Sequence, residues 1–121
     1  MSQCILVVED QEDNRQILRD LLSSAGYEMM EAENGEEALA ALAKRRPDLI
    51  LMDIQLPVMD GYEATRRIKA DPALRAIPII VVTSYALSGD QEKAFAAGCN
   101  AYVTKPFSPR QLLAKIREYL S

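Results

Sequence analysis

Three carboxylates follow apolar runs of the chain and could together hold a metal ion. Glu9 and Asp10 come directly after the run Cys4 to Val8. Asp53 comes directly after the run Leu49 to Met52. If the two runs are neighbouring parallel strands, about 4.8 Å apart, the three side chains converge in one pocket. Like charges at that separation are costly unless a cation neutralises them, and carboxylate oxygens with room for water suit Mg²⁺. The spacing therefore predicts a magnesium site.

Two further polar side chains follow later apolar runs. Thr83 comes after the run Ile77 to Val82, and its hydroxyl can donate a hydrogen bond. Lys105 precedes Pro106, which restricts its backbone to extended geometry and makes their peptide bond a candidate for the cis form. A carboxylate nucleophile, a divalent cation and a cationic clamp for oxygens are the parts needed for phosphoryl transfer to an aspartate. Asp53 is the best placed nucleophile of the set.

Composition limits the alternatives. A chain of 121 residues with 49% hydrophobic and 26% charged residues indicates one globular domain over residues 1–121. The sequence contains no histidine, which excludes histidine acid–base catalysis and histidine metal ligands. A net charge of -4 argues against nucleic-acid binding. The two cysteines, Cys4 and Cys99, are too few for a zinc site and are expected to be reduced thiols. With no signal peptide and no apolar run long enough to span a bilayer, we expect a cytoplasmic protein without a membrane partner.

The periodicity of apolar residues predicts the elements that must position these side chains. Short apolar runs predict five strands, at 4–8, 27–31, 49–52, 77–82 and 101–104. Apolar residues at helical spacing and capping residues predict a helix after each strand. The first helix carries the repeat of Ile17, Leu18, Leu21, Leu22 and Ala25. Later helices are marked by predicted N-terminal caps at Asn34, Ser88 and Ser108.

Strands alternating with helices predict an α/β protein with helices on both faces of a parallel sheet. The length and right-handed crossovers favour a flavodoxin-like, doubly wound (βα)5 fold with strand order 2-1-3-4-5. Such sheets bind ligands at the carboxyl ends of their strands. All of the chemistry-bearing residues follow strands in this way: Glu9, Asp10, Asp53, Thr83 and Lys105.

Four segments of the sequence resemble the receiver domain of two-component response regulators, the CheY-like family, over essentially the whole chain. They are VVED at 7–10, LMDIQLPVMDG at 51–61, VTS at 82–84 and AYVTKPF at 101–107. Each segment alone is weak evidence, but the four in this order are highly specific. The spacings from Asp10 to Asp53, Thr83 and Lys105 also fit the family.

The resemblance implies a phosphoacceptor switch rather than an enzyme with a separate substrate. By this resemblance Asp53 accepts a phosphoryl group from a phosphohistidine on a partner histidine kinase or phosphotransfer protein. Thr83 and Lys105 bind the phosphoryl oxygens. Mg²⁺ is held by three side chains and one backbone carbonyl, those of Glu9, Asp10, Asp53 and Gln55 respectively.

The family also implies how the signal reaches a partner. Phosphorylation draws the Thr83 hydroxyl inward, and the ring of Tyr102 moves from an exposed to a buried position. This movement remodels the surface of the fourth helix, fifth strand and fifth helix, where a downstream protein binds. The alternative is that Tyr102 is an ordinary half-buried strand tyrosine. Gln55, Ser84 and Tyr85 flank the phosphoryl site and are expected to control the access of water, and thus the phosphoryl lifetime.

Other protein classes fit the sequence less well. A haloacid-dehalogenase phosphatase needs an acidic residue two positions after its nucleophile, where this chain has Gln55. A flavin-binding module needs a phosphate-binding loop after the first strand, where this chain is strongly acidic. The Met1–Ser2 start and short C-terminus favour a stand-alone regulator of the CheY or DivK kind. The remaining alternatives are a receiver domain from a hybrid kinase and a receiver-like interaction module that is not phosphorylated.

Overall fold

Strands and helices alternate along the chain in the computed structural model, which describes residues 3–83 and 90–120. The predictions for Ser84, Tyr85 and Ser88 concern positions outside these described residues. The elements in chain order are β1 (Cys4–Val8), α1 (Glu12–Ser24), β2 (Glu28–Ala32), α2 (Gly35–Lys44), β3 (Leu49–Met52), α3 (Gly61–Ala70), β4 (Ile79–Thr83), α4 (Asp90–Ala97), β5 (Ala101–Thr104) and α5 (Pro109–Tyr119).

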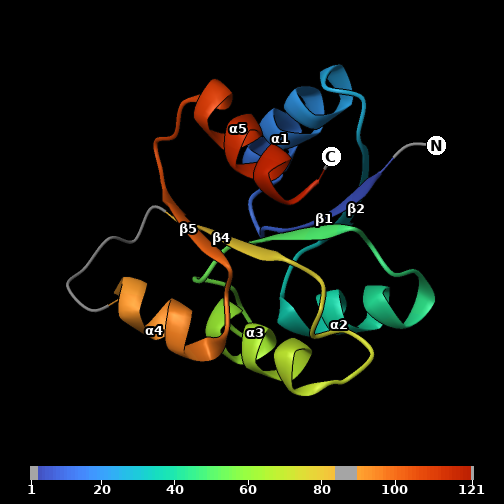
Figure 1. The fold of residues 1–121 in the computed structure, drawn as a ribbon, viewed down its shortest axis with the longest axis vertical. Coiled ribbons are helices and arrows are strands. Elements are labelled where there is room, and N and C mark those ends of the chain that lie inside the picture. Colours follow the sequence, from blue (N-terminus) through green and yellow to red (C-terminus); the bar gives the residue numbers. More distant parts are fainter. Residues whose placement is uncertain (1–2, 84–89, 121) are drawn as a thin grey trace.

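The strands form one parallel sheet with the order β2-β1-β3-β4-β5, as predicted. Helices α1 and α5 cover one face of the sheet, and α2, α3 and α4 cover the other (Figure 1). Val8 pairs with Met52 at the ends of β1 and β3, and the Asp53 N–H donates to the Val8 carbonyl at 3.0 Å. This register brings the residues that follow the two strands to the same edge of the sheet.

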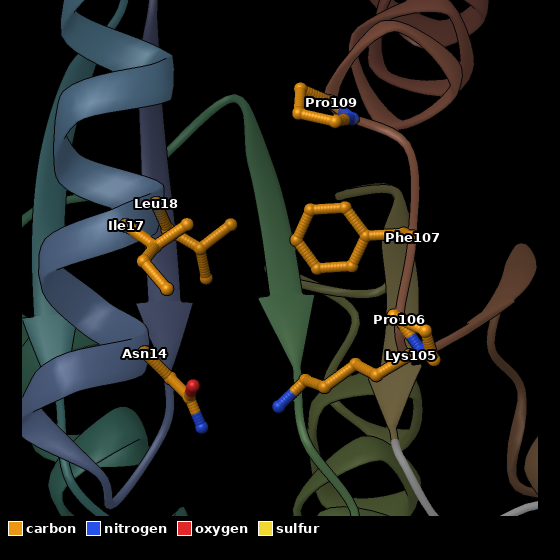
Figure 2. Close-up of a pocket in the computed structure, with 7 residues that line it drawn as sticks. All are labelled: Asn14, Ile17, Leu18, Lys105, Pro106, Phe107 and Pro109. Carbon is orange, nitrogen blue, oxygen red and sulfur yellow. The ribbon is translucent and has the colours of Figure 1, made fainter.

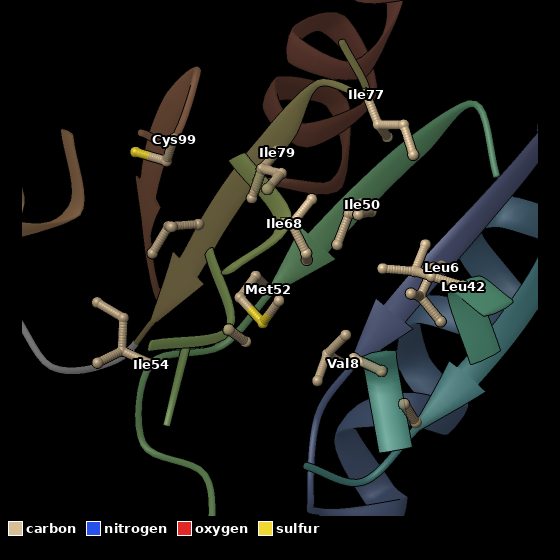
Figure 3. Packing of buried hydrophobic residues seen from close by; sticks show 14 of the residues in the cluster. Leu6, Val8, Leu42, Ile50, Met52, Ile54, Ile68, Ile77, Ile79 and Cys99 are labelled. Atoms are coloured by element: carbon tan, nitrogen blue, oxygen red, sulfur yellow. The ribbon is translucent and has the colours of Figure 1, made fainter. Parts of the chain in front are cut away.

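The core lies on both faces of the sheet because β1, β3 and β4 are buried along their whole length. Successive side chains of a strand point to opposite faces. Leu6 and Val8 accordingly pack toward α2 and α3, while Ile5 and Val7 pack toward α1 and α5. Figure 3 shows the first of these two layers around Met52 and Ile68. Burying each large aliphatic side chain stabilises the fold by roughly 1.5–3 kcal/mol.

Helix ends follow the predicted capping residues where the structure describes them. The Asn34 side chain accepts a hydrogen bond from the Glu37 N–H at 2.8 Å, and Ser108 accepts one from Gln111 at 3.4 Å. The Lys105–Pro106 peptide bond is cis, as the sequence suggested. None of the described helices is long and apolar enough to cross a membrane.

The apolar repeat of α1 is only partly buried, although its helical spacing predicts one apolar face. Ile17 is 57% exposed, whereas Arg15 is buried together with Leu18 and Leu22. The buried stripe of α1 thus contains a charged residue, which apolar periodicity alone excludes from a core face. The fourth strand is also shorter than predicted, because it begins only after Pro78, which has no N–H to donate.

Candidate functional site

The carboxyl ends of β1 and β3 bring three carboxylates together. Glu9, Asp10 and Asp53 each offer an oxygen, and these oxygens lie within 4.8 Å of one another. Glu9 is buried, while Asp10 and Asp53 are half-buried and reach the surface. The convergence predicted from the two apolar runs is therefore present in the structure.

Glu9 is held by three donors. One carboxylate oxygen, Oε1, lies 2.6 Å from Lys105 Nζ and accepts from Asn14 Nδ2 at 3.2 Å. The other, Oε2, accepts from the Gln11 N–H at 3.2 Å. Burial alone would raise the pKa of Glu9, but hydrogen bonds from Lys105 and Gln11 outweigh it and lower the pKa. Glu9 is therefore a fixed negative charge at neutral pH.

Asp53 is held less tightly. Its Oδ1 accepts from the Ile54 N–H at 2.7 Å, and its Oδ2 lies 3.4 Å from Lys105 Nζ. Burial raises the pKa of Asp53 to about 6, with Lys105 opposing the shift and Glu9 adding to it. Burial and the neighbouring Glu9 likewise raise the pKa of Asp10. The negative charges of Asp10 and Asp53 are thus only partly compensated by neighbouring positive charge.

Lys105 follows β5, the edge strand of the sheet, and its side chain extends toward the carboxylates at the ends of β1 and β3. Its N–H donates to the Thr83 carbonyl at 2.8 Å, which continues the β4–β5 pairing by one residue. Figure 2 shows the side chain extended from the loop after β5 toward Asn14 on α1. Burial would lower the pKa of Lys105, but the hydrogen bond with Glu9 and the charge of Asp53 raise it. Lys105 therefore carries a positive charge over the ends of the strands.

The remaining predicted site residues occupy different positions. Thr83 is buried at the end of β4, and Tyr102 is half-buried in β5, where it packs against the core layer under α2 and α3. Gln55 is exposed in the loop after β3. Ser84 and Tyr85 lie outside the described residues, so their predicted role stays a prediction.

A tightly packed loop joins Asp53 to α3. The Gly61 N–H donates to the Ile54 carbonyl at 2.9 Å, and a Cβ at Gly61 would lie 2.0 Å from the Asp53 carbonyl oxygen. The Gly35 N–H at the start of α2 donates to the Met59 carbonyl at 3.0 Å. The start of α3 therefore packs directly on the Asp53 backbone, with no space for a side chain.

Two residues beside the carboxylates were not predicted from the sequence. Asn14 donates to the Glu9 side chain, and Arg15 Nη1 donates to the Glu9 backbone carbonyl at 2.7 Å. A signal for Arg15 was present, because it shares helical spacing with the buried Leu18 and Leu22. A charged residue at such a position indicates a paired, functional or structural cation.

An apolar groove of about 430 Å³ opens beside the site, between α1 and the loop that leads into α5 (Figure 2). It was not predicted, because it depends on the exposure of Ile17. Lys105 and Asn14, which line one end of this groove in Figure 2, both contact the Glu9 carboxylate. The lining residues are Asn14, Ile17, Leu18, Lys105, Pro106, Phe107 and Pro109.

The donor set fits a hard divalent cation. Carboxylate oxygens from three residues lie close together, and Asp10 and Asp53 have raised pKa values because of burial and neighbouring negative charge. Oxygen ligands of this type suit Mg²⁺ rather than a softer metal. Asp53 is also exposed enough to meet a second molecule, with 12% of its side-chain surface accessible.

Comparisons with known proteins agree with this geometry. The sequence model of the response regulator receiver domain matches residues 5–117. The polar-differentiation response regulator DivK of Brucella anthropi is 46% identical over 120 residues, covering 99% of this chain and 98% of that protein. The receiver domain of a sensor histidine kinase from Pseudomonas aeruginosa, with a magnesium ion coordinated in its active-site cleft, is 40% identical with a TM-score of 0.91 and 98% coverage of both chains. The Vibrio cholerae chemotaxis protein CheY4 is 32% identical with a TM-score of 0.92, covering 99% of this chain and all of that one.

Proposed function

The chain belongs to the response regulator receiver domain family, a signalling family, and from this premise we propose that Asp53 is its phosphoacceptor. The observation that carries the proposal is the position of the Asp53 carboxylate, beside two other carboxylates and 3.4 Å from Lys105 Nζ. Receiver domains bind Mg²⁺ at such an acidic site. Asp53 reaches the surface there, so a phosphoryl donor has access to it.

The chemistry is transfer of a phosphoryl group to a carboxylate. An oxygen of Asp53 attacks the phosphorus, and a bond between that oxygen and phosphorus forms. The bond between phosphorus and the donor nitrogen breaks, and its electron pair stays on the donor imidazole. Because this chain contains no histidine, the phosphoryl donor is a separate molecule, either another protein or a small phosphodonor. The family points to a phosphohistidine on a histidine kinase or a phosphotransfer protein as the natural donor.

Charge control explains the rest of the site. Bound Mg²⁺ supplies positive charge beside the transferred oxygens. The carboxylates of Glu9, Asp10 and Asp53 and the backbone carbonyl of Gln55 would hold this ion. Lys105 neutralises the phosphoryl oxygens as well, because it is already charged and its Nζ lies between Glu9, at 2.6 Å, and Asp53, at 3.4 Å. The Thr83 hydroxyl donates a hydrogen bond to another of these oxygens.

The same site supports a switch at the face formed by α4, β5 and α5. Thr83 pairs with Thr104 and Val81 pairs with Tyr102 in the β4–β5 register, so a shift of Thr83 toward Asp53 is transmitted directly to β5. The resemblance implied an exposed Tyr102 ring, but the ring is half-buried here. In the proposed switch it becomes fully buried, and the altered face binds a downstream protein. Gln55, with Ser84 and Tyr85, sets how fast water removes the phosphoryl group.

Intact mass spectrometry tests the phosphoacceptor directly. With Mg²⁺ and acetyl phosphate, the parent protein is expected to gain one phosphoryl group, whereas Asp53→Asn gains none. Asp20→Asn is the matched control, since Asp20 is an exposed aspartate on α1 away from the cluster. An equal adduct on parent and Asp53→Asn, or no adduct on the parent, would show that Asp53 is not the working acceptor.

A second measurement tests the switch. Phosphorylated parent protein is expected to show amide chemical-shift changes in β5 and in the facing turns of α4 and α5. Thr83→Ala is expected to accept the phosphoryl group on Asp53 but to lose most of these changes. Identical shifts in both proteins would rule out Thr83 as the link between Asp53 and that face.

A further inference from the structure

Arg15 is a buried, positively charged residue that lies outside the carboxylate site, and no other lysine or arginine of the described residues is buried. It lies in the first half of α1 with 7% of its surface exposed, and arginine is rarely so buried unless it is paired. Its Nε lies 3.2 Å from Glu31, and its Nη2 contacts Glu12 and lies 3.5 Å from Glu33. The guanidinium therefore ties α1 to the end of β2 through Glu31 and Glu33, while Glu12 belongs to α1 itself.

The fourth contact of Arg15 points toward the site. Its Nη1 donates to the Glu9 backbone carbonyl at 2.7 Å, and this carbonyl belongs to the peptide that joins Glu9 to Asp10. The Glu9 N–H is held separately by the Ala32 carbonyl at 3.0 Å. Because a peptide group is planar, holding its carbonyl also fixes the direction in which the chain enters Asp10.

We infer that Arg15 is a positioning residue, which holds the Glu9–Asp10 peptide so that the Asp10 carboxylate faces Asp53. This inference rests on the proposed function, since it concerns the same magnesium site. Arg15 itself touches neither the ion nor the phosphoryl group. It acts through the backbone of its neighbours, and partners of this kind orient metal ligands in many proteins.

The direction in which Mg²⁺ affinity changes when Arg15 is replaced distinguishes a positioning role from a purely electrostatic one. Three carboxylates surround Arg15, so removing its positive charge leaves the region beside the site more negative. A more negative field attracts a cation more strongly. Electrostatics alone therefore predicts tighter Mg²⁺ binding without Arg15, whereas positioning predicts weaker binding.

Arg19 provides a matched control on the same helix. Its Nη2 lies 2.6 Å from Glu31 and 3.3 Å from Glu12, so it shares two carboxylates with Arg15. Its hydrogen bonds go to these carboxylates and to Gln16 rather than to the Glu9 peptide. Arg19→Met thus removes a positive charge from the same cluster and leaves the Glu9–Asp10 peptide held.

The experiment is a Mg²⁺ titration of the parent, Arg15→Met, Arg15→Lys and Arg19→Met proteins, followed by amide chemical shifts at constant ionic strength. Arg15→Met is expected to raise the Mg²⁺ dissociation constant about tenfold. Arg19→Met is expected to stay within twofold of the parent or to bind more tightly. Arg15→Lys is also expected to bind more weakly, because one ammonium cannot hold a peptide carbonyl and three carboxylates at once.

Each result decides the inference. Parent-like or tighter binding in folded Arg15→Met, or parent-like binding in Arg15→Lys, overturns positioning while leaving the proposed function intact. Absence of Mg²⁺ binding to the parent overturns the proposed function and the inference with it. Amide dispersion in the spectra reports whether each variant is folded, and if Arg15→Met does not fold, the affinity of Arg15→Lys is the deciding value.

Discussion

Lys105 lies closer to Glu9 than to Asp53, and this difference in distance contributes to the different pKa values of the two carboxyl groups. Its ammonium lies 2.6 Å from Glu9 and 3.4 Å from Asp53. Glu9 is thereby kept ionised, with a lowered pKa, while burial raises the pKa of Asp53 to about 6. A carboxylate whose charge is incompletely compensated gains most from a bound cation, which suits the role proposed for Asp53 as a magnesium ligand and phosphoacceptor.

The raised pKa of Asp53 predicts a stability effect in Mg²⁺-free buffer. The unfolded chain ionises this carboxyl near 3.8 and the folded chain near 6, so ionisation costs stability as pH rises from about 4 to 6. Asp53→Asn removes that cost and is expected to raise the free energy of unfolding at pH 7.5 by about 3 kcal/mol, measured by urea denaturation. The advantage should disappear below about pH 4.

Added Mg²⁺ is the control for this prediction. If the proposed site is right, Mg²⁺ binds the folded parent more tightly than folded Asp53→Asn. Added Mg²⁺ is then expected to reduce the difference in unfolding free energy between the two proteins. A parent that is more stable than Asp53→Asn at pH 7.5 without Mg²⁺ would contradict the raised pKa.

The β3–α3 loop is the element that fixes Asp53, and it does so by close backbone packing. Gly61 and Gly35 each lie against a carbonyl oxygen of this loop. A Cβ atom added at Gly61 would lie 2.0 Å from the Asp53 carbonyl oxygen, and one added at Gly35 would lie 2.7 Å from the Met59 carbonyl oxygen. Neither glycine has a positive φ, so the need is for space rather than for unusual backbone geometry.

Gly61→Ala is therefore expected to displace the Asp53 backbone. We expect a loss of about 2 kcal/mol or more in unfolding free energy, together with slower phosphorylation by acetyl phosphate. Gly26→Ala is the control, because Gly26 has φ +90 but no atom within 4 Å of a built Cβ. That variant should lose about 1 kcal/mol from backbone strain and keep its phosphorylation rate. Equal phosphorylation rates in the two variants would show that the packing at Gly61 does not position Asp53.

Val58 in the same loop is strained without compensation from packing. It has φ 68 and is 77% exposed, and β-branched residues are disfavoured in the left-handed region. Val58→Asn is expected to raise the unfolding free energy by about 1 kcal/mol, since asparagine tolerates this conformation. Val58→Ile keeps the branched side chain and should leave stability unchanged. A gain in both variants would mean that strain at this residue is not the cause.

At the scale of the whole molecule, one sheet with a buried layer on each face makes the fold cooperative. β1, β3 and β4 contribute side chains to both layers, so neither layer can open without the other. Cys4 and Cys99 are buried, free thiols, as expected. Cys4 lies in β1 and Cys99 just before β5, and the strands β3 and β4 lie between β1 and β5 in the sheet. The two thiols can report on unfolding of the whole molecule.

The raised pKa of the Cys99 thiol predicts that the free energy of unfolding falls at alkaline pH. Burial raises the pKa of Cys99 from 9.0 to about 11, so between these values the folded chain holds a proton that the unfolded chain has lost. The free energy of unfolding should therefore fall by about 2 kcal/mol from pH 9 to pH 11 in excess of any change in Cys99→Ala. Urea denaturation at each pH measures it, and parallel curves for the two proteins would contradict the raised pKa.

Local patterns in the sequence determined most of the architecture. Unbroken apolar runs occur where strands are covered on both faces, and right-handed crossovers leave few possible strand orders, so the order 2-1-3-4-5 followed. The meeting of Glu9, Asp10 and Asp53 was predictable for the same reason, because the ends of adjacent parallel strands lie at one edge of the sheet.

Only the tertiary structure decided how charges and exposed groups are distributed around that edge. Lys105 contacts Glu9 across 96 positions of sequence, more closely than it contacts Asp53. Arg15 takes a buried place on α1 and leaves Ile17 exposed, because carboxylates of β2 and the Glu9 peptide satisfy its guanidinium. The burial of Arg15 and the contacts of Lys105 depend on which partners the fold brings within hydrogen-bond distance. The periodicity of residues along one helix or strand does not reveal those partners.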